Sequence, residues 1–225
     1  MPKPHLLLLA GLLVAFGVSH YSDQIDPYYL DVLTGIGINV ILAVSLNLVN
    51  GYTGQFSLGH AGFMAVGAYL SAAVTVFLGP KLLGDEGGTL LQQGLLFLVA
   101  LVVGGLSAAF AGLLVGVPSL RLKGDYLALV TLGFGEIIRV IFQNVEVLGG
   151  ALGLNGIPPY TTIFWVLAFV AFAIFVVTCL VHSTYGRGFL ATHDDEIASE
   201  AVGLDTTRYK IVAFVVSAFF AGIAG

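Results

Sequence analysis

Long apolar runs separated by short polar connections dominate this chain of 225 residues. A helix that crosses the hydrocarbon core of a bilayer needs about 20 mostly apolar residues, and glycine is frequent within the runs, as in closely packed membrane helices. We therefore predict an all-α fold, with one domain over residues 1–225 that forms a polytopic transmembrane helix bundle of about seven spans. The expected spans are residues 6–19, 32–49, 57–78, 90–117, 126–145, 162–181 and 211–225.

The two terminal runs are short. Lys3 followed by residues 6–19 also has the look of a secretory signal peptide, although no small-residue cleavage site follows it. Residues 211–225 amount to about 15 residues of helix, too short to span a bilayer comfortably at a rise of 1.5 Å per residue. Small residues spaced four apart within this run form a helix-packing pattern for which the sequence shows no partner; they are Ser217, Ala221 and Gly225. We expect the chain to be C-terminally incomplete.

Composition supports the membrane interpretation and excludes several functions. Only 9% of the residues are charged and 58% are hydrophobic, whereas a soluble domain carries about 25% charged residues. The formal net charge is -5 and no basic patch suggests a nucleic-acid partner. A single cysteine, Cys179, rules out an internal disulfide framework. The sequence has no cofactor motif, and it has no cluster of His, Asp and Glu within the spans, so it does not indicate an enzyme.

The basic residues between the spans are distributed asymmetrically. If seven spans are counted, Lys81 is the only basic residue in the connections on one side of the membrane, and Arg139 lies within a span. Because cytoplasmic connections carry the excess of Lys and Arg, we predict a cytoplasmic N-terminus and a cytoplasmic loop over residues 183–210. The basic residues on this side are Lys3, Arg121, Lys123, Arg187, Arg208 and Lys210.

A polar, glycine-rich stretch at residues 51–63 joins the second and third spans. Non-helical backbone at membrane depth is tolerated only where it is buried in protein or lines a cavity, and a broken helix offers amide groups to a polar substrate. We expect a broken or re-entrant segment here, with Gln55, Ser57 and His60 on a substrate path. An ordinary cytoplasmic turn and a structural role for His60 are the alternatives.

Glu136 falls near the middle of the fifth span, and Arg139 lies one helical turn later on the same face. Ionisable residues at this depth are costly and usually face the bundle interior or a water-filled path. The two side chains are therefore candidates for polar contacts on the substrate path. A structural intrahelical ion pair is the alternative.

The loop after the sixth span contains a pattern typical of a short helix. Thr192 and Asp195 resemble a capping box and Gly203 is a natural stop, so we expect about eight helical residues between them. An isolated helix this short is marginal in water. The helix has a polar side and an apolar face, and the apolar face either binds in a groove of a partner protein or packs on the chain's own bundle. The polar residues are Asp195, Glu196 and Glu200, and the apolar residues are Ile197, Ala198, Ala201 and Val202.

Three stretches in this order resemble the permease subunits of branched-chain amino acid ABC importers of the Liv type, particularly the LivM-like subunits. The resemblance covers about residues 50–225. The stretches are Gly54-Gln55-Phe56-Ser57-Leu58-Gly59-His60-Ala61-Gly62-Phe63, then Leu120-Arg121-Leu122-Lys123-Gly124-Asp125-Tyr126-Leu127-Ala128 with Thr131-Leu132-Gly133-Phe134-Gly135-Glu136-Ile137, and Gly186-Arg187 with His193-Asp194-Asp195-Glu196, Ala201-Val202-Gly203, Tyr209-Lys210 and Ala213-Phe214.

This resemblance implies a non-enzymatic permease subunit in a bacterial inner membrane, which forms half of a translocation path. The implied partners are a second permease subunit, two ATP-binding cassette ATPases and a periplasmic substrate-binding protein. Related permeases handle urea or short amides, and an ion-coupled secondary transporter that uses Glu136 is a further alternative. The residues expected to couple to the ATPases are Arg187, Thr192, Asp195, Glu196, Ile197, Glu200, Ala201, Val202 and Gly203.

Overall fold

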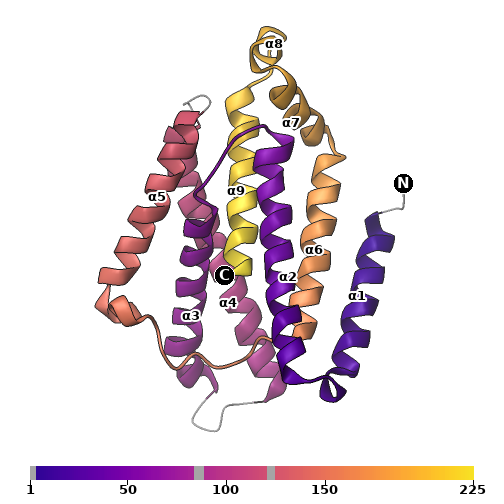
Figure 1. The fold of residues 1–225 in the computed structure, drawn as a ribbon, viewed down its shortest axis with the longest axis vertical. Helices are drawn as coiled ribbons and strands as arrows, with labels where there is room; N and C mark the ends of the chain where they lie inside the picture. The colour runs from indigo at the N-terminus through magenta and orange to yellow at the C-terminus, as the bar shows by residue number, and fades with distance from the viewer. Residues whose placement is uncertain (1–3, 84–88, 121–124) are drawn as a thin grey trace. The chain divides into compact units, whose positions relative to one another are not determined.

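The computed structural model describes residues 4–83, 89–120 and 125–225, and within these ranges every regular element is helical (Figure 1). Among the described residues, six helices are long and apolar enough to cross a membrane, which confirms the predicted polytopic bundle. They are α2 (Pro27–Asn47, extended by the π-helical turn η2, Leu48–Tyr52), α3 (His60–Leu83), α4 (Leu90–Ser119), α5 (Asp125–Asn144), α6 (Ile163–Val181) and α9 (Thr206–Ala224).

The remaining helices are shorter. The run predicted at residues 6–19 forms α1, Pro4–His20, an apolar helix of 17 residues. Of the charges used to assign the sides of the membrane, Lys3, Arg121 and Lys123 lie outside the described residues. The other short elements are η1 (Ser22–Gln24), η3 (Glu146–Leu148), η4 (Gly150–Leu152), α7 (Thr184–Asp194) and α8 (Glu196–Ala201).

The start predicted for the last helix is wrong. α9 begins at Thr206, earlier than Ile211, and has 19 residues. The reason is a cap, since a carboxylate oxygen of Asp205 accepts a hydrogen bond from the backbone N–H of Arg208 at 3.1 Å. A side chain in this position satisfies an N–H group that has no partner within the helix, so the helix extends through residues that hydropathy alone excludes.

The chain divides into two compact units. Unit 1 comprises Met1–Gly54 and Thr161–Lys210, and in it α6 packs against both α1 and α2 (Figure 1). α1 runs antiparallel to α6, because His5 lies beside Phe175 with ring centroids 5.8 Å apart while Gly11 contacts Ala171. α7 packs against η2, so α2 and α6 end on the same side of unit 1.

Unit 2 comprises Gln55–Tyr160 and Ile211–Gly225, and in it α3 packs against α4 and α5. The helices approach closely where glycine faces glycine. A Cβ atom added to Gly67 of α3 would overlap the backbone of Gly222 of α9, and one added to Gly222 would meet the carbonyl oxygen of Gly104 of α4 at 2.7 Å. Two of the small residues predicted to form a packing face, for which the sequence showed no partner, lie on this tightly packed helix. Ser217 and Ala221 are buried.

Candidate functional site

The predicted helix break lies between η2 and α3. Residues 53–59 are not helical, and α3 begins at His60. Side chains alternate along this segment, with the polar Gln55 and Ser57 buried and the apolar Phe56 and Leu58 exposed. This order is the reverse of that in a water-soluble protein and fits a segment whose polar side chains turn away from lipid.

Thr131 of α5 fixes the end of this segment. Its buried side-chain oxygen accepts a hydrogen bond from the backbone N–H of Leu58 at 3.0 Å and donates one to the carbonyl oxygen of Ala128 at 3.1 Å. A Cβ atom on Gly59 would lie 2.7 Å from the carbonyl oxygen of Thr131, so only glycine fits at this position. Sequence reasoning did not assign this role to Thr131, because a mid-span threonine carries no local signal of a distant partner.

The predicted pair on α5 is present. A terminal guanidinium nitrogen (Nη1) of Arg139 lies 3.4 Å from one carboxylate oxygen of Glu136 and 3.5 Å from the other, and the side chains are 63% and 59% exposed. Close packing between Gly62 and Gly135 brings the start of α3, which carries His60, against the middle of α5; a Cβ on Gly62 would lie 3.0 Å from the Cα of Gly135. All five predicted path residues thus belong to unit 2.

The loop after α6, which was predicted to hold one short helix, contains two. α7 begins after Ser183, whose hydroxyl accepts a hydrogen bond from the N–H of Tyr185 at 3.1 Å. It includes Thr192, so the prediction of Thr192 as the N-terminal cap is wrong. Thr192 is buried and donates a hydrogen bond to the carbonyl oxygen of Gly188 at 2.8 Å. The sequence pattern at Thr192 was misread because α7 had already begun at Thr184, after its cap at Ser183. Arg187 is exposed on α7.

The second of these helices, α8, is capped by Asp195, whose carboxylate accepts a hydrogen bond from the N–H of Ala198 at 3.0 Å. It ends before Gly203, which has φ of +88° and so takes a left-handed conformation that favours glycine. Four apolar side chains of this segment are exposed. Ile197 is 74% and Val202 79% exposed, and Ala198 and Ala201 are exposed as well.

The acidic residues of α8 face the first turn of α9. The ammonium nitrogen of Lys210 lies 2.7 Å from a carboxylate oxygen of Glu196, and the hydroxyl of Thr206 donates a hydrogen bond of 2.8 Å to Glu200. Lys210 and Thr206 are both buried. Sequence reasoning assigned Glu196 and Glu200 to a partner's surface and did not find these contacts within the chain.

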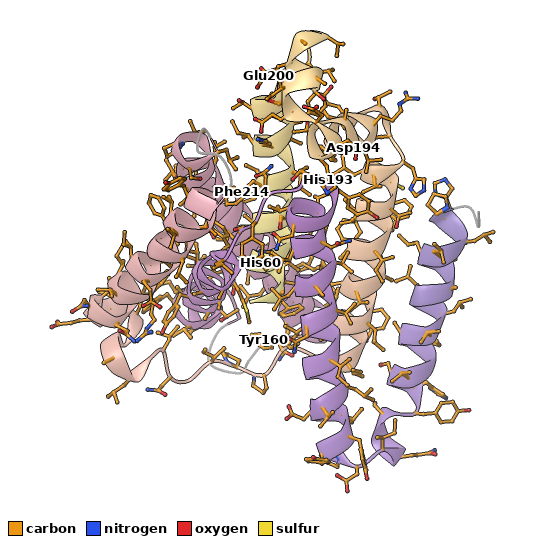
Figure 2. All side chains as sticks on the ribbon, turned by 45° about the horizontal axis from the view of Figure 1, so that its top comes forward. His60, Tyr160, His193, Asp194, Glu200 and Phe214 are labelled. Atoms are coloured by element: carbon orange, nitrogen blue, oxygen red, sulfur yellow. The ribbon has the colours of Figure 1, made fainter. Side chains whose placement is uncertain are left out.

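The end of α7 also contacts the chain that leaves η2. Gly54 has φ of +66°, and a Cβ atom there would lie 2.8 Å from Cδ2 of His193. His193 and Asp194 are exposed, and their side chains lie 3.4 Å apart (Figure 2). Among residues 4–83, 89–120 and 125–225, no group of three His, Cys, Asp or Glu side chains could hold a metal ion.

A pocket of about 260 Å³ lies in unit 2 between α3 and the loop that follows η4. The side chains around it are apolar apart from the hydroxyl of Tyr69, whose ring stacks on Phe142 with centroids 4.4 Å apart. Gly153, with φ of +75°, shapes the loop at this point. The lining residues are Ala68, Tyr69, Ala72, Gly153, Leu154 and Ile157.

Comparison with protein families shows which family the chain belongs to. The family described as "Branched-chain amino acid transport system / permease component" matches residues 28–225. The chain belongs to this family. As one of these permease components, it is a multi-pass membrane protein whose break before α3, ion pair on α5 and exposed face on α8 all lie within the matched region.

Three similar proteins are also described as branched-chain amino acid transport permease proteins. It is 36% identical over 258 residues to the high-affinity branched-chain amino acid transport system permease protein LivM of Salmonella typhimurium and 35% identical to that of Escherichia coli; each comparison covers 99% of this chain and 56% of the relative. A probable LivM of Methanocaldococcus jannaschii is 26% identical, over 86% of this chain and 65% of the relative. The chain thus spans little more than half the length of the first two relatives, and no solved structure matches it.

Proposed function

We propose that this chain acts as a permease subunit of an ABC importer for branched-chain, hydrophobic amino acids in a bacterial inner membrane. It forms half of a translocation path together with a second permease subunit. Two ATP-binding cassette ATPases drive the transport, and a periplasmic binding protein delivers the substrate. Membership of the permease-component family and the names of the LivM relatives support this proposal.

The observation that carries the proposal is the exposed apolar face of α8. A helix of six residues is too short to be stable alone, yet Ile197 and Val202 are among the more exposed large apolar side chains. In a soluble loop such a face favours a protein partner. We assign the ATPase as this partner, with Ala198 and Ala201 completing the contact and Arg187 at its edge.

The path residues fit the same function. The Glu136–Arg139 pair is exposed on a helix long enough to span the membrane, and ionisable groups facing hydrocarbon are costly. We propose that this face of α5 meets the second permease or the aqueous path, together with Gln55, Ser57 and His60 near the start of α3. The apolar pocket beside Tyr69 suits an aliphatic side chain on the way to that path.

The docking proposal is tested by placing a charge on the exposed face of α8. Ala201→Asp should leave an unpaired carboxylate in the contact and lower both the binding of the ATPase subunits and amino acid uptake. Val147→Asp adds the same charge at an exposed position in the connection between α5 and α6, which the span count puts on the other side, and should change neither. Equal ATPase binding by wild type and Ala201→Asp would refute the docking assignment.

The proposed orientation has its own test. In a Cys179→Ser background, the thiol introduced by Glu200→Cys should react in intact cells only with a thiol reagent that crosses the membrane. Reaction with an impermeant reagent added to the periplasm would show that the orientation is opposite to the one proposed, and it would refute the importer assignment.

Two rival functions predict different uptake. In a permease for urea or short amides, competition by these compounds would reduce substrate uptake, whereas competition by leucine would not. A secondary transporter that uses Glu136 would stop when the proton gradient is collapsed at constant ATP, and Glu136→Gln would abolish that dependence. The importer instead requires ATP hydrolysis by its partner subunits and continues without a proton gradient.

A further inference from the structure

The contacts between α8 and the first turn of α9 point to a mechanical role, which depends on the function proposed above. We infer that the Glu196–Lys210 ion pair and the Glu200–Thr206 hydrogen bond form the joint through which movement of α8 by the ATPase is passed to α9. We call these four residues the α8–α9 joint. They belong to unit 1, and each contact is made between side chains.

The ion pair fixes one end of the joint. The side chain of Lys210 is only 9% exposed and that of Glu196 is 25% exposed. A buried ammonium group separated from its carboxylate is strongly unfavourable. Movement of Glu196 away from its position therefore either carries Lys210 with it or leaves the charge uncompensated, so the pair resists separation.

The hydrogen bond fixes a second point one helical turn away. Glu200 lies on α8 four residues after Glu196, and Thr206 lies on α9 four residues before Lys210. The order of the two contacts along the helices is therefore reversed, as it is between two antiparallel segments. Two contacts about one turn apart oppose rotation of α8 about either contact, which a single contact would allow.

The side of α8 that makes the joint differs from the side proposed to bind the ATPase. Ile197, Ala201 and Val202 are exposed, whereas Ser199 is buried and donates a hydrogen bond to the carbonyl oxygen of Ala191 at 2.8 Å. Glu196 and Glu200, which the sequence analysis also expected to couple to the ATPases, make these contacts within the chain. α8 thus has one face for a partner and another face bonded to α7 and α9.

α9 is suited to pass the movement on because it is one continuous helix from Thr206 to Ala224. Its later residues pack tightly in unit 2, where Gly222 contacts Gly67 and Ala218 contacts Gly112. Energetic coupling between distant sites travels through rigid, packed elements. A displacement at the first turn of α9 would therefore reach the glycine contacts with α3 and α4.

Variants that weaken the joint without disturbing the docking face provide the test. Thr206→Val is nearly isosteric and removes the hydroxyl that donates to Glu200, whereas Thr206→Ser keeps it. Lys210→Met removes the ion pair, and Lys210→Arg keeps it. Arg208→Gln, at an exposed position in the same turn, is the matched control. Each variant is assembled in membranes with its ATPases, second permease and binding protein, and ATPase binding, ATP hydrolysis and amino acid uptake are measured together.

We expect Thr206→Val and Lys210→Met to bind the ATPases as wild type does but to transport about fivefold less amino acid per ATP hydrolysed, the lower end of typical coupling between sites. Thr206→Ser, Lys210→Arg and Arg208→Gln should keep the wild-type ratio. A role limited to folding would lower the amount of complex and leave the ratio unchanged. Because Lys210→Met leaves Glu196 without its partner and could fail to fold, the Thr206 pair decides the outcome in that event.

The outcomes separate this inference from the proposed function. An unchanged ratio of uptake to ATP hydrolysis in Thr206→Val overturns the joint even when Ala201→Asp abolishes ATPase binding. Loss of ATPase binding in Thr206→Val and Lys210→Met also overturns it, since the residues would then hold α8 for docking. Failure of the wild-type chain to bind any ATPase refutes the proposed function, and the joint is refuted with it.

Discussion

The backbone N–H of Leu58 donates a hydrogen bond to the side-chain oxygen of Thr131 at 3.0 Å, across 73 positions of sequence. This contact ties the non-helical segment before α3 to the first half of α5. The segment has little regular structure of its own, so its position depends on contacts of this kind.

Removal of the Thr131 hydroxyl should loosen this segment. Thr131→Val keeps the shape of the buried side chain but leaves the Leu58 N–H without its acceptor, which costs about 1–3 kcal/mol. We expect a lower midpoint of thermal unfolding in detergent and faster amide exchange at Leu58. Thr131→Ser should preserve both values, and equal exchange rates in the valine and serine variants would contradict the assigned role.

Enlargement of Gly67 should disrupt the packing of α3 against α9. A Cβ atom at this position overlaps the backbone of Gly222, so Gly67→Ala should destabilise unit 2 by about 1–3 kcal/mol, as overpacking does. The measurement is the thermal unfolding midpoint of the purified protein. Gly94→Ala is the control, because a Cβ atom there meets nothing within 4 Å; a similar loss in both variants would argue against the glycine contact.

Gly54 and His193 should show coupled effects on stability. Gly54→Ala introduces strain at φ of +66° and a close approach of 2.8 Å to the imidazole ring, and the left-handed conformation alone costs about 1–2 kcal/mol. His193→Ala removes the close approach but not the strain. In a double-mutant cycle, Gly54→Ala should therefore be less destabilising in the His193→Ala background, and equal costs in the two backgrounds would show that the ring and the glycine do not touch.

The cap of α8 should control whether this helix is formed. Asp195→Ala removes the acceptor for the Ala198 N–H and costs about 1 kcal/mol, a large effect for a helix of six residues. Amide exchange over 196–201 should accelerate, while Asp195→Asn should retain most of the protection. Asp194→Ala, at a neighbouring exposed side chain, should leave the exchange rates unchanged. Acceleration in both alanine variants would indicate that the cap is not specific.

Hydrophobicity predicted the long helices because each needs a sustained apolar run, and this signal is local. The ends were harder to predict. α9 starts at Thr206 because Asp205 caps it, and the polar turn from Thr206 to Lys210 hides this start from a hydropathy scan. A search for capping residues upstream of each apolar run would have found Asp205.

The apolar face of α8 was predicted from the helical spacing of its apolar residues, although the start of its helix was misread at Thr192 and its exposure was left open. The partners of Glu196 and Glu200 could not be predicted, because they depend on how α8 folds back on α9. An acidic side chain on a short helix has the same sequence signature whether it binds water, another subunit or a buried lysine such as Lys210. Only the geometry distinguishes these possibilities.

The glycine contacts between α3, α4 and α9 restrict which residues of these helices can change during evolution. At Gly67, Gly104 and Gly222 any side chain added by mutation meets another backbone or a neighbouring Cβ atom, so substitutions there should be eliminated by selection one at a time. Leu106 and Phe110 of α4 are exposed and can interchange with other apolar residues. Over generations, mutations should therefore accumulate on the outer surface of α4 while its inner surface remains fixed.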